Sequence, residues 1–334
     1  MDRSNVLTVL ALSAIGALVV LTCSDSGQEP PPSQDQQIRE LRQRLQKLET
    51  RVGDLEHRPA EAKSAPAKIV DKVVTNLELK TAKEPLESVG VCTLTGKVIF
   101  DGKPPERKHQ ADRMKGHRDS PKCNDGDSRD PLWIVDKNGG VANVVIWLKP
   151  ANGKFFVPPR LRQIGDEKVI MDQPHCAFEP HVVAFQPSYF DPVAKKQQQS
   201  GQILEIRNSA QMNHNVSWHG NRLLNPGMNW ILKPKGHTVV EAMPCKYEET
   251  GKADLLSISC DIHKWMTAKA AVFDHPYFAV TNAKGEFEIK DIPANTELTL
   301  AIWHESMDPD SLSGAHKELV TFGAGKSLRE IKLH

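Results

Sequence analysis

The stretch Ser-Cys-Asp-Ile-His-Lys-Trp-Met, residues 259–266, points most directly to a fold and a chemistry. Within seven residues it offers the Cys260 thiolate, the His263 imidazole and the Met266 thioether. β-rich segments lie on both sides, and a loop between two strands can curl so that these side chains meet at one point. Soft sulfur ligands combined with imidazole select copper among the biological metals. The stretch therefore predicts a copper-binding loop between two strands.

A second imidazole lies upstream in the sequence Asn213-His214-Asn215. His214 follows a predicted strand at 203–208 and precedes Cys260 by 46 positions. A Cys-x-x-His pair alone is a weak signal that also occurs in structural and zinc sites, but zinc sites usually add further Cys or His pairs at short spacing. The combination of His214 with the downstream loop favours copper.

This pattern resembles the cupredoxin family of plastocyanin, amicyanin and pseudoazurin. The resemblance implies one type 1 copper with His214, Cys260 and His263 as trigonal ligands and Met266 as a longer axial ligand. It also implies that Asn215 hydrogen-bonds across to the cysteine loop from outside the ligand set. The gap from His263 to Met266 is shorter than in amicyanin, so a backbone oxygen or a water remains an alternative axial ligand. The same spacing occurs in the binuclear copper centre of cytochrome oxidase, but the second cysteine of that loop is missing.

From about residue 90 to the end, short β-prone runs alternate with turn residues, as in β-sandwiches. The expected strands are 92–100, 141–148, 182–185, 203–208, 238–242, 255–259, 268–273, 278–281, 286–289 and 298–303.

Two runs, LTGKVIFDGKPP at 94–105 and GGVANVVIWLK at 139–149, resemble the opening strands of the carboxypeptidase regulatory-like (transthyretin-like) sandwich. The continuation of that pattern comes only at 281–294. The resemblance implies a mainly β fold. In it, a cupredoxin Greek-key domain at 155–273 is inserted in, or packed on, a discontinuous transthyretin-like sandwich at 89–154 plus 274–334.

Three further runs, 176–182, 260–266 and 274–281, resemble exported planctomycete proteins of the methylamine-utilisation or plastocyanin-like type. The role of His175 and His181 stays open between an additional metal site and a simpler arrangement. In the simpler one, which we favour, Cys176 forms a disulfide and His181 opens a strand. His275, His304 and Glu305 are interpreted as polar residues at strand ends, because no nucleophile or paired carboxylate accompanies them.

The N-terminus predicts export. Residues 6–22 are almost uninterruptedly apolar, and Cys23 follows them as in a bacterial lipoprotein site. Residues 1–23 are therefore a cleaved signal peptide, a lipid anchor at Cys23 or an uncleaved membrane anchor. All three place the rest of the chain in the periplasm or at the cell surface.

A linker and a heptad pattern follow. Residues 24–37 are expected to be disordered, and 58–88 to form a spacer rich in Ala, Lys, Pro and Glu. The 38–57 segment has apolar a and d positions, which favours either a parallel homodimeric coiled coil or a monomeric amphipathic helix. These positions are Ile38, Leu41, Leu45, Leu48, Val52 and Leu55.

Six cysteines leave four for disulfides if Cys23 is lipidated or removed and Cys260 binds metal. Four cysteines allow three pairings. We prefer Cys123–Cys176 together with Cys92–Cys245.

The charge balance, 43 Lys and Arg against 42 Asp and Glu, argues against nucleic-acid binding. A metal held entirely by protein ligands leaves no open position for a substrate, so we expect no enzyme but a membrane-tethered one-electron carrier. Its redox partner is unknown, and His263, as an edge histidine, is the expected electron exit. Two alternatives stay open: a copper-binding or delivery module that does not cycle the metal, and a cell-surface scaffold with a degenerate site.

Overall fold

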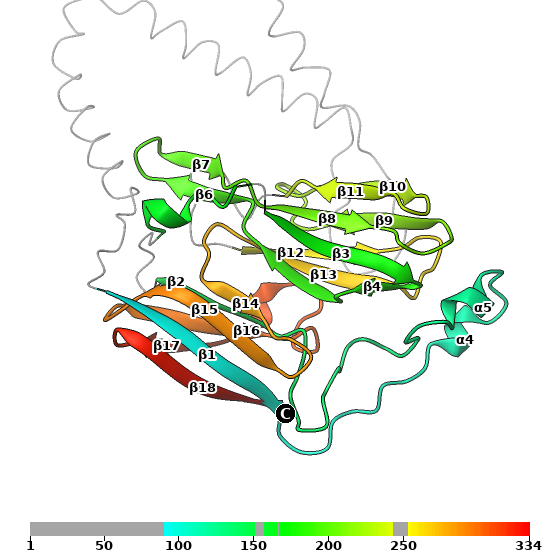
Figure 1. Cartoon of the computed structure of the whole chain (residues 1–334), viewed down its shortest axis with the longest axis horizontal. Coiled ribbons are helices and arrows are strands. Elements are labelled where there is room, and N and C mark those ends of the chain that lie inside the picture. Colours follow the sequence, from blue (N-terminus) through cyan, green and yellow to red (C-terminus); the bar gives the residue numbers. More distant parts are fainter. Residues whose placement is uncertain (1–89, 151–156, 166, 243–252) are drawn as a thin grey trace, which may run out of the picture. The chain divides into compact units, whose positions relative to one another are not determined.

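The computed structural model describes residues 90–150, 157–165, 167–242 and 253–334. The predicted anchor, heptad helix and spacer, together with Cys23, lie outside these residues. Almost all regular structure is β-strand, arranged in two sandwiches (Figure 1). This confirms the predicted mainly β fold class. No helix among the described residues is long and apolar enough to cross a membrane.

The first sandwich is built from strands at both ends of the described chain. Its two sheets have the orders β15-β1-β18 and β14-β2-β16-β17. The strands are β1 (Val91–Phe100), β2 (Val145–Pro150), β14 (Phe278–Val280), β15 (Glu286–Pro293), β16 (Glu297–Trp303), β17 (His316–Thr321) and β18 (Gly325–Leu333). Alternating burial along β1 places Leu94 and Val98 in the core with Ile289 and Leu300, as expected for a strand with one face covered.

The second sandwich is made of the strands between β2 and β14. Its sheets have the orders β10-β9-β12-β13-β5 and β11-β8-β3-β4, and β6-β7 forms a separate hairpin. The strands are β3 (Lys168–His175), β4 (Ala177–Glu179), β5 (Val182–Phe185), β6 (Ser188–Asp191), β7 (Lys196–Gln199), β8 (Ile203–Arg207), β9 (His214–His219), β10 (Met228–Leu232), β11 (His237–Val240), β12 (Ala253–Ser259) and β13 (Thr267–Phe273). The β3–β8 and β13–β5 pairs are parallel, so the chain crosses between sheets rather than running as a simple meander.

One expected strand starts later than predicted. The run 141–148 predicts a continuous strand, but β2 begins only at Val145. Asn143 has a φ of 64°, a left-handed conformation that a strand does not accommodate. Val141 is therefore not part of β2. It is buried, and its backbone pairs with Val135 in an isolated bridge.

The two sandwiches share an apolar contact. Trp147 of β2 and Trp303 of β16 pack in one buried cluster with Ala271 and Phe273 of β13. The Trp147 and Phe273 ring centroids are 5.7 Å apart. The outward face of β2 and β16 is therefore covered by the second sandwich, which explains why both strands are apolar on both faces.

The chain between β1 and β2 leaves the first sandwich, packs against one end of the second sandwich and returns. We call residues 107–130 of this stretch the cover segment. It contains two single-turn helices, α4 (Ala111–Met114) and α5 (Ser120–Cys123) (Figure 1). The backbone amides of Gln110 and Asp130 donate to carbonyls on the opposite arm and close the segment on itself. Met114 and Cys123 are buried in the core of the second sandwich.

The disulfide between Cys123 and Cys176 is present and joins the cover segment to the second sandwich. Among the described residues Cys92 is a free thiol, completely buried among apolar side chains of the first sandwich. The preferred second bridge, from Cys92 to Cys245, stays a prediction, because Cys245 lies outside the described residues. The remaining short elements are two 3-10 turns, η2 (Pro159–Leu161) and η3 (Leu312–Gly314).

Candidate metal centre

His214 is the first residue of β9, a central strand between β10 and β12. Antiparallel pairing with Leu232 holds its backbone, and the side chain is fully buried. Its Nδ1 atom lies 3.0 Å from Nδ1 of His263. The strand thus presents one ring nitrogen directly to the cysteine loop.

The loop 260–266 joins β12 to β13 in a tight turn. The ladder between these strands runs up to the pair Ser259 and Thr267, after which the Cys260 amide donates to the Met266 carbonyl. The Met266 amide in turn donates to the carbonyl of His263. These bonds curl the loop so that Cys260 Sγ lies 3.9 Å from His263 Nδ1.

The three groups match the spacing of a trigonal metal site. The ligand atoms of His214, Cys260 and His263 all lie within 4.8 Å of one another. A metal bonded at roughly 2.0 Å to nitrogen and 2.3 Å to sulfur in a trigonal plane would hold the nitrogens about 3.5 Å apart, and nitrogen and sulfur about 3.7 Å apart. The observed 3.0 Å and 3.9 Å are close to these values. The residues present therefore fit a copper ion without a large rearrangement.

Burial prepares these groups for metal binding. It lowers the pKa of His214 to about 4, with the neighbouring His263 adding to the effect, and it also lowers the pKa of His263. Both imidazoles are therefore neutral at pH 7 and have a ring lone pair to offer. Burial raises the pKa of the Cys260 thiol, so binding of a metal would displace its proton. The backbone amides of Asn215 and His263 already donate to this sulfur.

Asn215 connects β9 to the cysteine loop. Its Oδ1 accepts the backbone N–H of Asp261 at 2.8 Å, and its Nδ2 donates to Oδ1 of Asn229 on β10. Asn229 donates to the Asp261 carboxylate at 2.7 Å. This closed network ties together the two chain segments that bear His214 and Cys260.

Met266 closes the loop and is buried, with 2% of its surface exposed. It belongs to the same core as Cys260 and Trp265. Its role as axial ligand stays a prediction.

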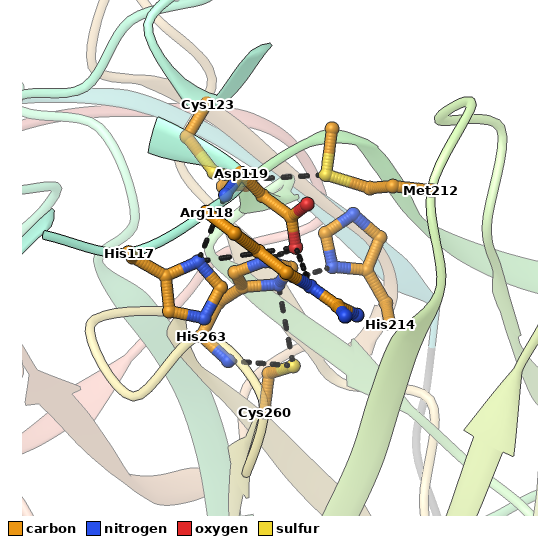
Figure 2. The surroundings of a disulfide bond; sticks show 9 residues. His117, Arg118, Asp119, Cys123, Met212, His214, Cys260 and His263 are labelled. Atoms are coloured by element: carbon orange, nitrogen blue, oxygen red, sulfur yellow. Dashed lines mark hydrogen bonds and ion pairs between the residues drawn. A yellow bond between two sulfur atoms is a disulfide. The ribbon is translucent and has the colours of Figure 1, made fainter. Parts of the chain in front are cut away.

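A further layer of side chains covers His263, and these come from the cover segment. Asp119 directs its carboxylate at the ring (Figure 2), with Oδ2 3.2 Å from His263 Nε2. The centroid of the His117 ring lies 4.9 Å from that of the His263 ring. The His117 ring also packs edge-on against Trp265. His263 is therefore not the edge histidine that was expected, because its side chain has 0% exposure under this layer.

His175 and His181 lie apart from the three converging groups. Neither belongs to a cluster of His, Cys, Asp and Glu ligand atoms within the described residues. His181 immediately precedes β5; its Nδ1 faces the Thr267 carbonyl, and its Nε2 lies 2.7 Å from Glu305 Oε2. His175 lies against Gly126, where an added Cβ would be 2.4 Å from the imidazole ring. His181 therefore links the two sandwiches, and His175 packs against the cover segment.

His275 and His304, which the sequence analysis interpreted as polar residues at strand ends, are buried away from the three converging groups. His275 accepts the backbone N–H of Tyr277 at 3.2 Å. His304 stacks on Trp133 with ring centroids 4.1 Å apart and contacts Ser306 through Nδ1. Burial lowers the pKa of His275 to about 3 and that of His304 to about 4, so both rings are neutral at pH 7.

No protein-family model matches the chain, and no curated protein is similar to it. Among solved structures, a reduced amicyanin variant is 15% identical, with 33% of this chain and 85% of that chain covered and a TM-score of 0.23. Another reduced variant is 14% identical, with 38% and 98% covered and the same TM-score. A novel purple cupredoxin from Nitrosopumilus maritimus is 13% identical, with 32% and 99% covered and a TM-score of 0.20. Because these sequence identities and TM-scores are low, the function proposed below rests on the residues of this chain and not on the similarity to these structures.

Sequence reasoning missed His117 and Asp119. Both lie more than 140 positions before His263, the residue that they cover, and no motif marks them. One signal was available: a disulfide from Cys123 to Cys176 places residues near 119 beside the His175 end of the second sandwich. That constraint locates the segment but does not reveal which side chain faces the metal centre.

Proposed function

We propose that this chain binds one type 1 copper ion through His214, Cys260 and His263, with Met266 as the axial ligand, and carries single electrons. The observation that supports this most directly is the convergence of two imidazole nitrogens and one thiol within bonding range of a common point. A copper ion held there would supply a Cu(I)/Cu(II) couple. Two nitrogens, a thiolate and a thioether form the donor set typical of blue-copper electron-transfer sites.

The protein scaffold suits electron transfer because it holds the ligands in place before metal binds. His214 is held by the β9 ladder, and Cys260 and His263 by the closed turn of their loop. The Asn215 network joins the two parts. Ligands that move little between oxidation states keep the reorganisation energy of electron transfer low, which is the physical requirement for a carrier.

The burial of the site argues against a delivery module. Both imidazoles have 0% exposure and Cys260 has 1%. A protein that hands its metal to a partner needs an accessible ligand from which exchange can start. The buried site is better suited to a carrier that keeps its metal ion while the ion changes oxidation state. A site enclosed by protein ligands also offers no position for a substrate.

We also propose that the carrier acts outside the cytoplasm, attached to the membrane through residues 1–23, with 38–57 available for pairing with a second copy. The apolar run at 6–22, Cys23 and the heptad pattern support this part of the proposal. The redox partner is a protein of unknown identity.

Copper loading of the full chain tests the proposal. We expect an intense visible absorption band on adding Cu(II), its loss in Cys260→Ser, and reversible voltammetry. Cys92→Ser is the matched control, because it removes the other buried free thiol, which lies in the first sandwich, and should leave the colour unchanged. A colourless loaded protein, or equal colour in Cys260→Ser, would refute a type 1 site. Loss of metal on reduction would favour copper storage or delivery.

A further inference from the structure

We propose that Asp119 is a positioning residue for the metal centre: its carboxylate hydrogen-bonds the outer nitrogen of His263, biases the site toward the oxidised metal and seals the ring from solvent. This rests on the proposed copper site and adds a residue that comes from outside the second sandwich. The key observation is the contact between Asp119 and the His263 ring (Figure 2), in which Asp119 Oδ2 lies 3.2 Å from His263 Nε2. The His263 side chain is fully buried.

The cover segment places Asp119 firmly. Asp119 immediately precedes α5, which ends at Cys123, and that cysteine is bonded to Cys176, the residue after β3. Arg113 donates to the Lys264 carbonyl, which belongs to the loop 260–266. The segment is thus fastened to the second sandwich on two sides of Asp119.

The contact has a defined chemical effect. A carboxylate that accepts the Nε2–H of a histidine fixes the proton on that nitrogen, so the Nδ1 lone pair faces the metal. In this site Nδ1 is also the atom that faces His214 and Cys260. The hydrogen bond makes the imidazole a stronger donor, and the negative charge beside it stabilises Cu(II) more than Cu(I). We therefore expect Asp119 to lower the reduction potential.

The same contact blocks the route by which an electron would pass directly from His263 to a partner protein. Asp119 and His117 occupy the outer edge of the His263 ring, so a partner protein cannot touch this ring.

A second metal ion bound between His117, Asp119 and His263 is a poorer interpretation of this cluster. The Nδ1 atom of His117 already accepts the Asp119 backbone N–H at 3.2 Å.

The test uses the full-length, copper-loaded protein and two variants of Asp119. Asp119→Asn removes the charge but keeps an oxygen acceptor, and Asp119→Ala removes both. The matched control is Asp125→Asn, which makes the same charge change at an exposed position of the same segment. Removal of such a partner typically weakens metal binding by 10–100-fold. Each tenfold loss confined to Cu(II) raises the potential by about 59 mV.

We expect both Asp119 variants to raise the potential relative to Asp125→Asn, and Asp119→Ala to raise it further. In the metal-free protein, ¹⁵N NMR should show the His263 proton on Nε2, in slow exchange with water, and exchange should become faster in Asp119→Ala. Potentials equal to that of the control, or a proton on Nδ1, would overturn the inference. If wild-type protein binds no copper, the proposed function fails instead, and the NMR result still tests the hydrogen bond. Circular dichroism and retention of the disulfide establish that each variant is folded.

Discussion

Asn215 offers the most informative test of how the centre is held together. Its side chain links β9 to the backbone of the loop 260–266, because its Oδ1 accepts the Asp261 amide at 2.8 Å. The same side chain also donates to Asn229. Asn215→Ala deletes both hydrogen bonds and leaves the ligands themselves unchanged. The perturbation therefore separates the support of the ligands from their identity.

The expected magnitude follows from those two bonds. Each typical hydrogen bond contributes about 1 kcal/mol to stability, and a buried group left without its partner costs about 1–3 kcal/mol. Asn229 still donates to the Asp261 carboxylate and retains part of the network. We expect a loss of about 2–3 kcal/mol in the free energy of unfolding of the metal-free protein. We also expect a 10–100-fold loss of copper affinity, as for other residues that orient metal ligands.

Urea unfolding and competition titration with a copper chelator measure the two effects. Asn282→Ala is the matched control: its side-chain oxygen also accepts backbone amides, those of Lys284 and Glu286, but in the first sandwich. It should change stability without changing copper affinity. If Asn215→Ala binds copper as tightly as Asn282→Ala does, the network does not orient the ligands and the reasoning is refuted.

Two predictions concern stability. Burial lowers the pKa of His275 to about 3, below its ordinary 6.5, so the unfolded state binds more protons between these values and stability falls as the pH drops from about 6.5 toward 3. His275→Asn should flatten the free energy of unfolding measured against pH in that range; an unchanged slope would contradict a buried neutral ring. The Cys123–Cys176 bridge closes a loop of 53 residues, so the double serine variant should lose about 4 kcal/mol in chemical denaturation. An equally stable variant would show that the cover segment docks without its covalent link.

Much of the β architecture was predictable because strands leave a local signature. The runs at 92–100, 203–208, 268–273 and 298–303 coincide closely with β1, β8, β13 and β16. Eight of the described strands were missed, among them β3, β9 and β10. Polar residues interrupt their apolar alternation, as in His-Asn-Val-Ser-Trp-His of β9 and the mostly exposed β10. Pairing with neighbouring strands, rather than local pattern, stabilises them as sheet.

The candidate ligands could be proposed from the sequence, because the Cys-x-x-His turn between strands and the upstream His-Asn pair together resemble the cupredoxin pattern. What covers them was not identifiable in this way. Asp119 is 144 positions from His263 and approaches it only because the cover segment docks across the end of the second sandwich. Composition, periodicity and motif spacing therefore predicted more than half of the strands and the candidate metal ligands, while export stays a prediction from the N-terminal sequence. Tertiary packing alone decided the exposure of His263 and the carboxylate beside it, since contacts between distant segments depend on how whole sheets meet.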